Sequence, residues 1–472
     1  MKIVLTVHQF FPDCRAGTEV LTLAVATELI RRGHQVVVFS GHAATQQIDD
    51  EARFEECSFQ GVPVFRFHHA FVPMGGQEVV AELEHDNHLA NKYFTDIVER
   101  VKPDAIHFFH FGRLGMGLID VACAFDIPAY YTPTDFWWIC PTNQLMLADG
   151  QACSGPRRFA GNCVKHVAAL TSNKVVAALA PLVPDAIVDV AVRVATVSWL
   201  PKHRLMREAD AVFKRADFNI HRLNALQRIF SPSGLMTETL VSRGIKPEII
   251  AETKFGIDVS SYSENPWALK LDRVATFGFI GTLSRHKGCH ILLAAFKRLK
   301  IGSARLLIYG DLSQFPDYSA HLLALAEGSE FIEFRGTFPN ASIAGILVEM
   351  DALVVPSLWH ENTPLVIFSA LAAKCPVICS SQRGMTELVS NGINGFVFES
   401  ENILALQSVL QQFIDDRRLA ARLSANCEKP KSIEGYVDEL VHSYYAGLPP
   451  HNSYFAQCNT VRSLLSNEKM GL

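Results

Sequence analysis

Two loop-to-helix junctions in the second half of the sequence combine residue types that could bind a phosphorylated sugar. The first is Trp-His-Glu-Asn-Thr-Pro-Leu-Val-Ile-Phe-Ser-Ala at 359–370, after the buried strand expected at Ala352–Pro356. Thr363 suits an N-cap and Pro364 the first helical position. The free N–H groups at such a helix start bind phosphate, and Glu361 could accept hydrogen bonds from sugar hydroxyls. An exposed glutamate before an ordinary helix start explains the pattern equally well.

The second junction is Phe-Ile-Gly-Thr-Leu-Ser-Arg-His-Lys-Gly at 279–288, where a predicted strand ends at Gly281. Arg285 and Lys287 precede the next predicted helix and could neutralise a diphosphate. The alternative is a solvated basic loop.

Near the N-terminus, Gly17 opens a predicted helix after the first strand, at a point where backbone could approach a ligand closely. The surrounding residues do not form a G-x-G-x-x-G fingerprint, which argues against a dinucleotide-dependent dehydrogenase.

The elements that must position these loops alternate between strand and helix. The chain begins with a strand at Lys2–Val7, a helix at Thr18–Arg32 and a strand at Gln35–Ser40, a βαβ unit that predicts a parallel sheet. Alternation breaks after Cys140, with helical or irregular signals over 141–230, and resumes in the second half. The pattern predicts an α/β chain of two doubly wound domains. The expected divisions are an N-terminal domain at 1–256 with an insert at about 140–230, a C-terminal domain at 257–430, a final helix at 431–448 and a weakly ordered tail at 449–472.

These motifs carry a family resemblance. Gly-Thr-Leu-Ser-Arg-His-Lys-Gly, the run from Met350 through Trp-His-Glu-Asn-Thr-Pro-Leu, and Pro-Val-Ile-Cys-Ser-Ser-Gln-Arg-Gly-Met-Thr-Glu-Leu-Val-Ser-Asn-Gly-Ile-Asn-Gly-Phe from 376 resemble family 4 glycosyltransferases in order and spacing. The resemblance covers about 1–135 and 230–447 and is more specific in the C-terminal half. It implies the GT-B fold, with two Rossmann-like domains facing an interdomain cleft, and transfer of a sugar from a nucleotide-diphosphate donor with retention of configuration.

The resemblance also implies roles for individual residues. Lys287 contacts the donor diphosphate, Glu361 contacts the sugar, and Asp135 is the aspartate retained after the fifth strand of the first domain; these three are the implied catalytic residues. The final helix crosses back to the first domain. The implied donor-binding set is Gly17, Gly281, Arg285, Lys287, Asn362, Thr363, Pro364, Leu365 and Ser369.

Three positions depart from the family pattern. Ser369 replaces the second of two glutamates, which predicts donor binding weaker by ~1–2 kcal/mol. Thr282 replaces an arginine, and Thr134 replaces a histidine. These departures leave two alternatives to the transferase: a nucleotide-sugar-binding protein with lost or weak turnover, and another GT-B enzyme such as a sugar-nucleotide epimerase. No D-x-D-type carboxylate pair is placed for the diphosphate, so no catalytic metal is expected.

A loop-rich stretch at the start of the insert contains a candidate zinc set, Cys140, Cys153, Cys163 and His166. Cys3His is a set that binds structural zinc, and Cys-x2-His is ligand-like spacing, whereas the gaps of twelve and nine residues are unlike paired knuckles. Four independent buried side chains are the alternative.

Composition limits the remaining possibilities. The chain has 472 residues, is 49% hydrophobic and 19% charged, and has a formal net charge of −5, so it is globular and lacks the basic excess of a nucleic-acid binder. Its start lacks a signal-peptide pattern, and no run of ~20 uncharged apolar residues occurs. We expect a cytoplasmic protein with a glycan or lipid-linked acceptor. Apolar residues 167–200 precede seven Lys and Arg at 201–230, which predicts either peripheral contact with the inner membrane face or a packed insert with a solvated basic face.

Overall fold

The computed structural model describes residues 1–44, 48–147, 150–170, 174–197, 199, 203–262 and 267–445. The chain divides into two compact units. Unit 1 comprises residues 1–232, 236–254 and the stretch from 434 onwards, and unit 2 comprises 233–235 and 255–433. The tail expected to be weakly ordered, 449–472, lies outside the described residues.

Unit 1 is built on an eight-stranded sheet with the order β3-β4-β2-β1-β5-β6-β7-β8. Only β3 runs antiparallel to its neighbour among the described strand pairs. The strands are β1 (Lys2–Val7), β2 (Gln35–Ala43), β3 (Phe54–Phe59), β4 (Val62–His69), β5 (Ala105–Phe108), β6 (Ala129–Tyr131), β7 (Arg228–Ser231) and β8 (Ile250–Glu252). Strands β3, β7 and β8 were not predicted from the sequence. Glu55 and Glu56 interrupt the apolar pattern of β3, while β7 and β8 are only four and three residues long.

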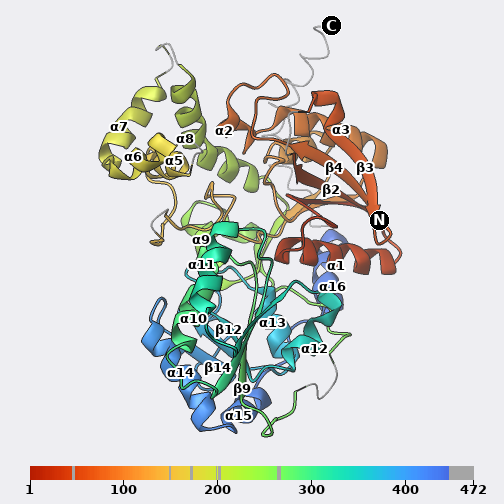
Figure 1. Ribbon diagram of the computed structural model, residues 1–472. Coiled ribbons are helices and arrows are strands. Elements are labelled where there is room, and N and C mark those ends of the chain that lie inside the picture. Colours follow the sequence, from red (N-terminus) through yellow and green to blue (C-terminus); the bar gives the residue numbers. More distant parts are fainter. Residues whose placement is uncertain are drawn as a thin grey trace. The chain divides into compact units, whose positions relative to one another are not determined.

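The helices of unit 1 include a separate group that forms the insert. The first group is α1 (Gly17–Arg31), α2 (Val80–Leu83), α3 (His88–Val101), α4 (Leu118–Ala124) and, apart from its first two residues, α9 (Gly234–Ser242), with the 3-10 turns η1 (Asp50–Ala52) and η3 (Pro247–Ile249). The insert contains α5 (Gly161–Ala169), α6 (Lys174–Leu179), η2 (Ala180–Leu182), α7 (Asp185–Ala195) and α8 (Arg204–Leu223). These helices, yellow to olive in Figure 1, lie together.

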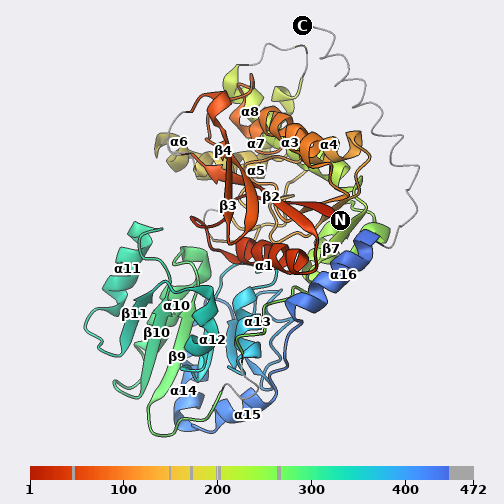
Figure 2. The same cartoon turned by 90° about the vertical axis from the view of Figure 1, so that its right-hand side faces the viewer.

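Unit 2 is a six-stranded parallel sheet with the order β11-β10-β9-β12-β13-β14. Its strands are β9 (Ala275–Ile280), β10 (Ala304–Tyr309), β11 (Ile332–Gly336), β12 (Ala352–Val355), β13 (Val377–Ser380) and β14 (Gly395–Phe398). Its helices are η4 (Arg285–Lys287), α10 (Cys289–Phe296), α11 (Pro316–Ala326), η5 (Asn340–Ser342), α12 (Ile343–Leu347), α13 (Leu365–Ala372), α14 (Ile403–Asp415) and α15 (Leu419–Ala425). Figure 2 shows helices on both faces of this sheet. Two apolar clusters line it, one including Phe277, Leu292 and Leu410 and the other Leu353, Ile367 and Val377.

The last described helix, α16 (Ile433–Tyr445), belongs to unit 1 apart from its first residue. Its Asp438 accepts a hydrogen bond from Arg32 at the end of α1, Tyr436 bonds Thr132 at 3.2 Å between hydroxyls, and Tyr444 bonds His107. The contacts of Tyr436 and Tyr444 lie among buried side chains and fix the helix against β5 and the end of β6, whereas Arg32 and Asp438 pair at the surface.

No single helix in the described part of the chain is long and apolar enough to cross a bilayer. Lys174–Leu182 and Asp185–Ala195 reach that length and composition only when taken together, and they are bent by 114° relative to one another.

Candidate functional site

The loop between β9 and α10 places Lys287 beside the end of β12. Strand β9 ends at Ile280, and Arg285–Lys287 form one 3-10 turn that ends at Gly288 with φ +72°. A Cβ on Gly288 would lie 1.9 Å from the Pro356 carbonyl oxygen, so only glycine allows this loop to approach so closely. Sequence reasoning identified Lys287 and did not identify the glycine that positions it.

Glu361 lies in the loop between β12 and α13 and is buried, at 5% exposure. Its Oε1 accepts hydrogen bonds from Lys287 Nζ at 2.5 Å, Ser357 Oγ at 2.7 Å and Trp359 Nε1 at 2.8 Å. The Lys287 ammonium also lies 5.3 Å from the centre of the Trp359 ring. The alternative of an exposed loop glutamate is therefore wrong.

Burial alone would raise the pKa of Glu361, because a low-dielectric site disfavours its charge. The Lys287 ammonium outweighs that effect, helped by the Ser357 and Trp359 hydrogen bonds, and the pKa is lowered. The site thus holds a fixed carboxylate–ammonium pair. None of the three hydrogen bonds uses Oε2.

A glycine after β13 completes the support of Glu361. Gly384 has φ +86°, and a Cβ there would lie 1.7 Å from the Glu361 carbonyl oxygen. Three residues later, Glu387 accepts hydrogen bonds from the backbone N–H groups of Gly234 and Leu235, each at 2.9 Å. Both residues lie in the motif that begins at Pro376. A glycine that follows a predicted strand can indicate that two backbone segments approach closely. The sequence does not show, however, that Gly384 approaches Glu361.

Helix α13 begins one residue later than predicted. Pro364 is its N-cap, with extended backbone (ψ 116°), and Leu365 is the first helical residue. The prediction of Thr363 as N-cap and Pro364 as first helical residue is wrong, because the backbone of Pro364 is still extended and the helical conformation begins only at Leu365. Asn362 and Thr363 are buried. The Asn362 side-chain oxygen accepts a hydrogen bond from Ser233 Oγ at 2.9 Å.

Ser369, one turn into α13, is buried and hydrogen-bonds the hydroxyl of Tyr262. Burial raises the pKa of Tyr262, and the Ser369 bond opposes that rise. Gly281 lies at the carboxyl end of β9, where the only neighbours of an added Cβ would be ring atoms of Phe279 at 3.7 Å or more. Arg285 is exposed on the 3-10 turn.

Unit 1 has its own polar cluster after the carboxyl ends of β1, β5 and β6. Asp135 accepts a hydrogen bond from the Trp137 N–H at 2.8 Å and lies 3.0 Å from His110 Nε2. The His110 ring lies against His8, with centroids 3.9 Å apart, and His8 Nε2 lies 3.6 Å from Glu19 Oε1. Gly17, the first residue of α1, is exposed. The structure therefore gathers His8, Glu19, His110 and Asp135, of which only Asp135 was singled out as a site residue.

Burial raises the pKa of Glu19 to about 7, even though the Ala16 N–H hydrogen-bonds its carboxylate at 2.6 Å. The adjacent His8 has a pKa well below its usual value because of burial, His110 and Arg113. A neutral His8 cannot pair electrostatically with Glu19, so this carboxyl exchanges its proton near neutral pH.

The four candidate zinc ligands lie around one cavity of about 10 Å³ in unit 1. Its lining includes Cys140, Cys153, Cys163 and His166. Burial raises the pKa of Cys163 to about 12, and the other two thiols add to the rise. Among the residues described, however, no three His, Cys, Asp or Glu side chains are arranged to hold a metal ion.

The geometry of unit 2 suits an anionic ligand. A lysine, the carboxylate it pairs with, and a helix start meet beyond the carboxyl ends of β9 and β12, which are neighbours in the sheet. Ligands of doubly wound sheets bind at this edge. The ammonium and the helix N–H groups can bind phosphate, and a buried carboxylate can accept hydroxyl hydrogen bonds.

Comparison with known proteins agrees with this reading of unit 2. Residues 263–429 match the family model for glycosyl transferases group 1. The chain is 25% identical over 209 residues to the putative colanic acid biosynthesis glycosyltransferase WcaL of Salmonella typhimurium, covering 42% of this chain and 50% of that protein. It is 36% identical over 116 residues to an Escherichia coli UDP-Gal:alpha-D-GlcNAc-diphosphoundecaprenol alpha-1,3-galactosyltransferase, covering 24% and 28%. The chain spans about half the length of the first curated relatives it matches.

Solved structures confirm the fold over nearly the whole chain. Anabaena HepE in complex with UDP and glucose superposes with a TM-score of 0.61 at 16% identity, covering 95% of this chain and 100% of that one. WaaG, a glycosyltransferase involved in lipopolysaccharide biosynthesis, gives 0.58 at 13% identity, covering 94% and 100%. The predicted GT-B fold of two Rossmann-like domains and the resemblance to group 1 glycosyl transferases are both confirmed.

Proposed function

We propose that this protein transfers a sugar from a nucleotide-diphosphate donor to an acceptor, with retention of configuration. The observation that carries the proposal is the Glu361–Lys287 pair at the ligand-binding edge of the unit 2 sheet, in which the buried Glu361 carboxylate also accepts hydrogen bonds from Ser357 and Trp359. The family match of unit 2 and the UDP-bound structure of HepE support a nucleotide-sugar donor.

In this proposal the leaving diphosphate is stabilised by Lys287, by Arg285 and by the N–H groups at the start of α13, with the backbone of Asn362, Thr363, Pro364 and Leu365 around it. Glu361 orients the donor sugar by accepting hydroxyl hydrogen bonds. Gly281 leaves room at the end of β9, and Ser369 offers its hydroxyl to the ribose. The backbone N–H of Gly17 is a further proposed donor-binding group.

The acceptor side belongs to unit 1. There Asp135 and His110, 3.0 Å apart, lie beside His8 and Glu19. A carboxyl whose pKa is about 7 can give or take a proton at neutral pH. The polysaccharide and lipid-linked substrates in the names of WcaL and the galactosyltransferase favour a glycan or lipid-linked acceptor from cell-surface polysaccharide or lipopolysaccharide synthesis.

The alternative function is nucleotide-sugar binding with lost or weak turnover. It is favoured by one observation: Ser369 stands in place of a charged residue, and its hydroxyl already bonds Tyr262.

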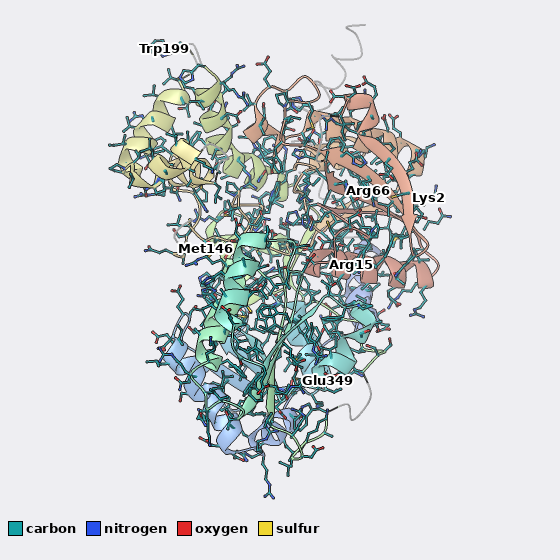
Figure 3. All side chains as sticks on the ribbon, viewed as in Figure 1. Lys2, Arg15, Arg66, Met146, Trp199 and Glu349 are labelled. Atoms are coloured by element: carbon teal, nitrogen blue, oxygen red, sulfur yellow. The ribbon has the colours of Figure 1, made fainter. Side chains whose placement is uncertain are left out.

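Calorimetric titration with UDP-, GDP-, ADP- and dTDP-sugars tests the donor site. We expect one donor to bind to the wild type, and binding to fall at least about a hundredfold in Glu361→Ala, since a charge-assisted contact and its buried partner are both disturbed. The matched control is Glu349→Ala, which removes an exposed glutamate of unit 2 (Figure 3) and should leave affinity unchanged. Absence of binding to every donor would contradict both functions.

Turnover separates the two functions. Donor hydrolysis or transfer to an acceptor-lipid extract, lost in Glu361→Ala and retained in Glu349→Ala, supports the transferase. Binding without any turnover supports the alternative, and isomerised donor formed without acceptor would indicate an epimerase.

A further inference from the structure

The outer helices of the insert expose apolar side chains that an isolated globular domain would bury. On α7, Ile187, Val190 and Val194 follow helical spacing and are all exposed, whereas only Val192 and Ala195 are buried. Leu182, at the end of η2, is 75% exposed, and Leu179 on α6 is also exposed. Trp199 is 81% exposed and is labelled at the outer end of the insert in Figure 3. We call Leu179, Leu182, Ile187, Val190, Val194 and Trp199 the apolar face.

The acidic side chains of α7 do not belong to this face. Asp185 pairs with Arg157 at 2.9 Å and Lys165 at 3.0 Å, and Asp189 accepts the Gly161 N–H at 3.0 Å. All three partners lie at or before α5. The acids of α7 are therefore used to hold the insert together.

The inner helix of the insert is firmly attached to unit 1. Arg215 of α8 lies 4.5 Å from the centre of the Trp137 ring and is buried, and Asn219 bonds the Trp138 carbonyl at 2.9 Å. Glu208 accepts the N–H groups of Val80 and Ala81 at the start of α2. The apolar face is thus displayed by a fixed support.

The charge of the insert is opposite to that of the chain. Residues 157–215 contain ten Lys and Arg against four Asp and Glu, whereas the whole chain has a formal net charge of −5. A second copy docked face to face would bring two positive surfaces together, which disfavours self-association. A surface that is both apolar and positive matches the acyl chains and phosphates of an anionic bilayer.

We propose that the apolar face of the insert docks on an anionic lipid membrane, with α6 and α7 lying in the interface. The bend of 114° between Lys174–Leu182 and Asp185–Ala195 fits helices lying flat better than a single span. Lys174 and Arg204, at the two ends of the apolar segment, meet the lipid headgroups. Docking would place unit 1 at the surface where a lipid-linked acceptor resides.

Vesicle sedimentation of the full chain tests the proposal, with phosphatidylcholine vesicles that contain or lack phosphatidylglycerol. We expect binding to the anionic vesicles, and a loss of at least about a hundredfold in partitioning when Leu182→Ser, Ile187→Ser and Val190→Ser are combined, since each exposed apolar side chain contributes to insertion. The matched control is Ile301→Ser with Leu404→Ser, two exposed apolar residues of unit 2, which should bind as the wild type does.

The electrostatic part is tested by Lys174→Gln and Arg204→Gln, each expected to weaken anionic binding about fivefold. Three results would overturn the proposal: no vesicle binding by the wild type, equal loss in the unit 2 control, or lipid-free self-association that the triple serine variant abolishes. The assay contains no sugar donor, so its outcome is independent of the proposed transferase.

A second proposal rests on the cavity lined by Cys140, Cys153, Cys163 and His166, at the start of the insert. The four side chains around the cavity of about 10 Å³ come from one loop and from α5, where Cys163 and His166 lie on the same helical face. Cys153 Sγ accepts the Gly155 N–H at 3.4 Å and lies 3.7 Å from Asn162 Nδ2. Three thiols and one imidazole around one small cavity form a ligand set that suits structural zinc.

We infer that Cys140, Cys153, Cys163 and His166 bind one structural zinc ion, with small side-chain rotations that turn the ligands into the cavity. Elemental analysis of untagged, reduced protein should find one zinc per chain. Cys163→Ser should lose it, and Cys57→Ser, which alters a half-buried thiol on β3, should keep it. Folded wild-type protein without zinc would overturn the inference, whether or not Cys163→Ser folds.

Discussion

Each unit buries one glutamate near the carboxyl ends of its parallel strands, and the two carboxyls have opposite electrostatics. In unit 2, Glu361 pairs with Lys287 at 2.5 Å, and its pKa is lowered. In unit 1, Glu19 faces His8, whose own pKa is far below its usual value, and burial raises the pKa of Glu19 to about 7. Burial is similar at both sites. The presence of a permanent cation decides whether the carboxyl is a fixed charge or a proton carrier.

The largest expected effect comes from disturbing the backbone that supports Glu361. Gly384→Ala places a Cβ 1.7 Å from the Glu361 carbonyl oxygen at a residue with φ +86°. We expect unit 2 to lose about 4 kcal/mol or more in free energy of unfolding, because a backbone atom must move. Gly392→Ala is the matched control: φ is +76°, but nothing lies within 4 Å of the new Cβ. It should cost only about 1 kcal/mol. Equal losses in chemical denaturation would show that the close approach is unimportant.

Removing the cation from unit 2 should make Glu361 resemble Glu19. Lys287→Met leaves a buried carboxylate without its ammonium, and we expect about 3 kcal/mol lower stability at pH 7 and a raised Glu361 pKa. In the wild type the lowered pKa of Glu361 stabilises the folded state at pH values above 4.5, the usual pKa of a glutamate. This contribution is lost as the pH falls through the lowered folded pKa. The variant should reverse that slope and gain stability on acidification towards 4.5. Denaturation across this pH range measures it, and an unchanged slope would contradict the pair.

Unit 1 should show the opposite pH dependence. The pKa of Glu19 is raised from 4.5 to about 7, so the folded state binds the proton more tightly than the unfolded state. The stability it contributes is complete below pH 4.5 and is lost as pH rises to about 7, by about 2 to 3 kcal/mol. Glu19→Gln keeps the size and removes the titration, so the wild-type and variant curves should converge near pH 4.5 and separate by pH 8. The lowered pKa of His8 acts in the other direction and destabilises the folded state as the pH falls below 6.5. This contribution is present in both the wild type and Glu19→Gln. Parallel curves would exclude a raised Glu19 pKa.

The two sites also differ in how much the sequence revealed. Lys287, Glu361 and the helix at α13 were predictable, because glycine, proline and charge are concentrated where strands end and helices begin. The start of α13 was misplaced by one residue, since proline fits both the N-cap and the first turn. Gly384 and Ser357 act through partners that only the folded chain brings together. In unit 1 the polar cluster joins residues far apart in sequence, such as His8 and His110, and no local pattern connects them.

The strands show the same distinction. The fully buried parallel strands, such as β1 and β12, are continuous apolar runs and were located to within a residue or two. Every residue of the edge strand β3 is at least partly exposed, and the strand pairs antiparallel with β4. Its stability therefore comes from its neighbour rather than from its own apolar pattern.

The smallest expected effect concerns Ser369, which stands where the family pattern has a glutamate. Ser369→Glu should tighten donor binding by about 1 kcal/mol, roughly sixfold in Kd, if a charged acceptor for the ribose is all that the site lacks. The gain is limited because Ser369 is buried beside Tyr262, and a carboxylate there must displace the existing hydroxyl bond. Ser369→Gln introduces a side chain of nearly the same size as glutamate but without its charge, and it should not tighten donor binding. If both variants weaken donor binding equally, the pocket is shaped for serine and the transferase works with a neutral ribose contact. If Ser369→Glu creates turnover where the wild type has none, the wild type is a binding protein. The site of unit 2 would then lack a carboxylate at position 369, just as the site of unit 1 lacks a cation beside Glu19.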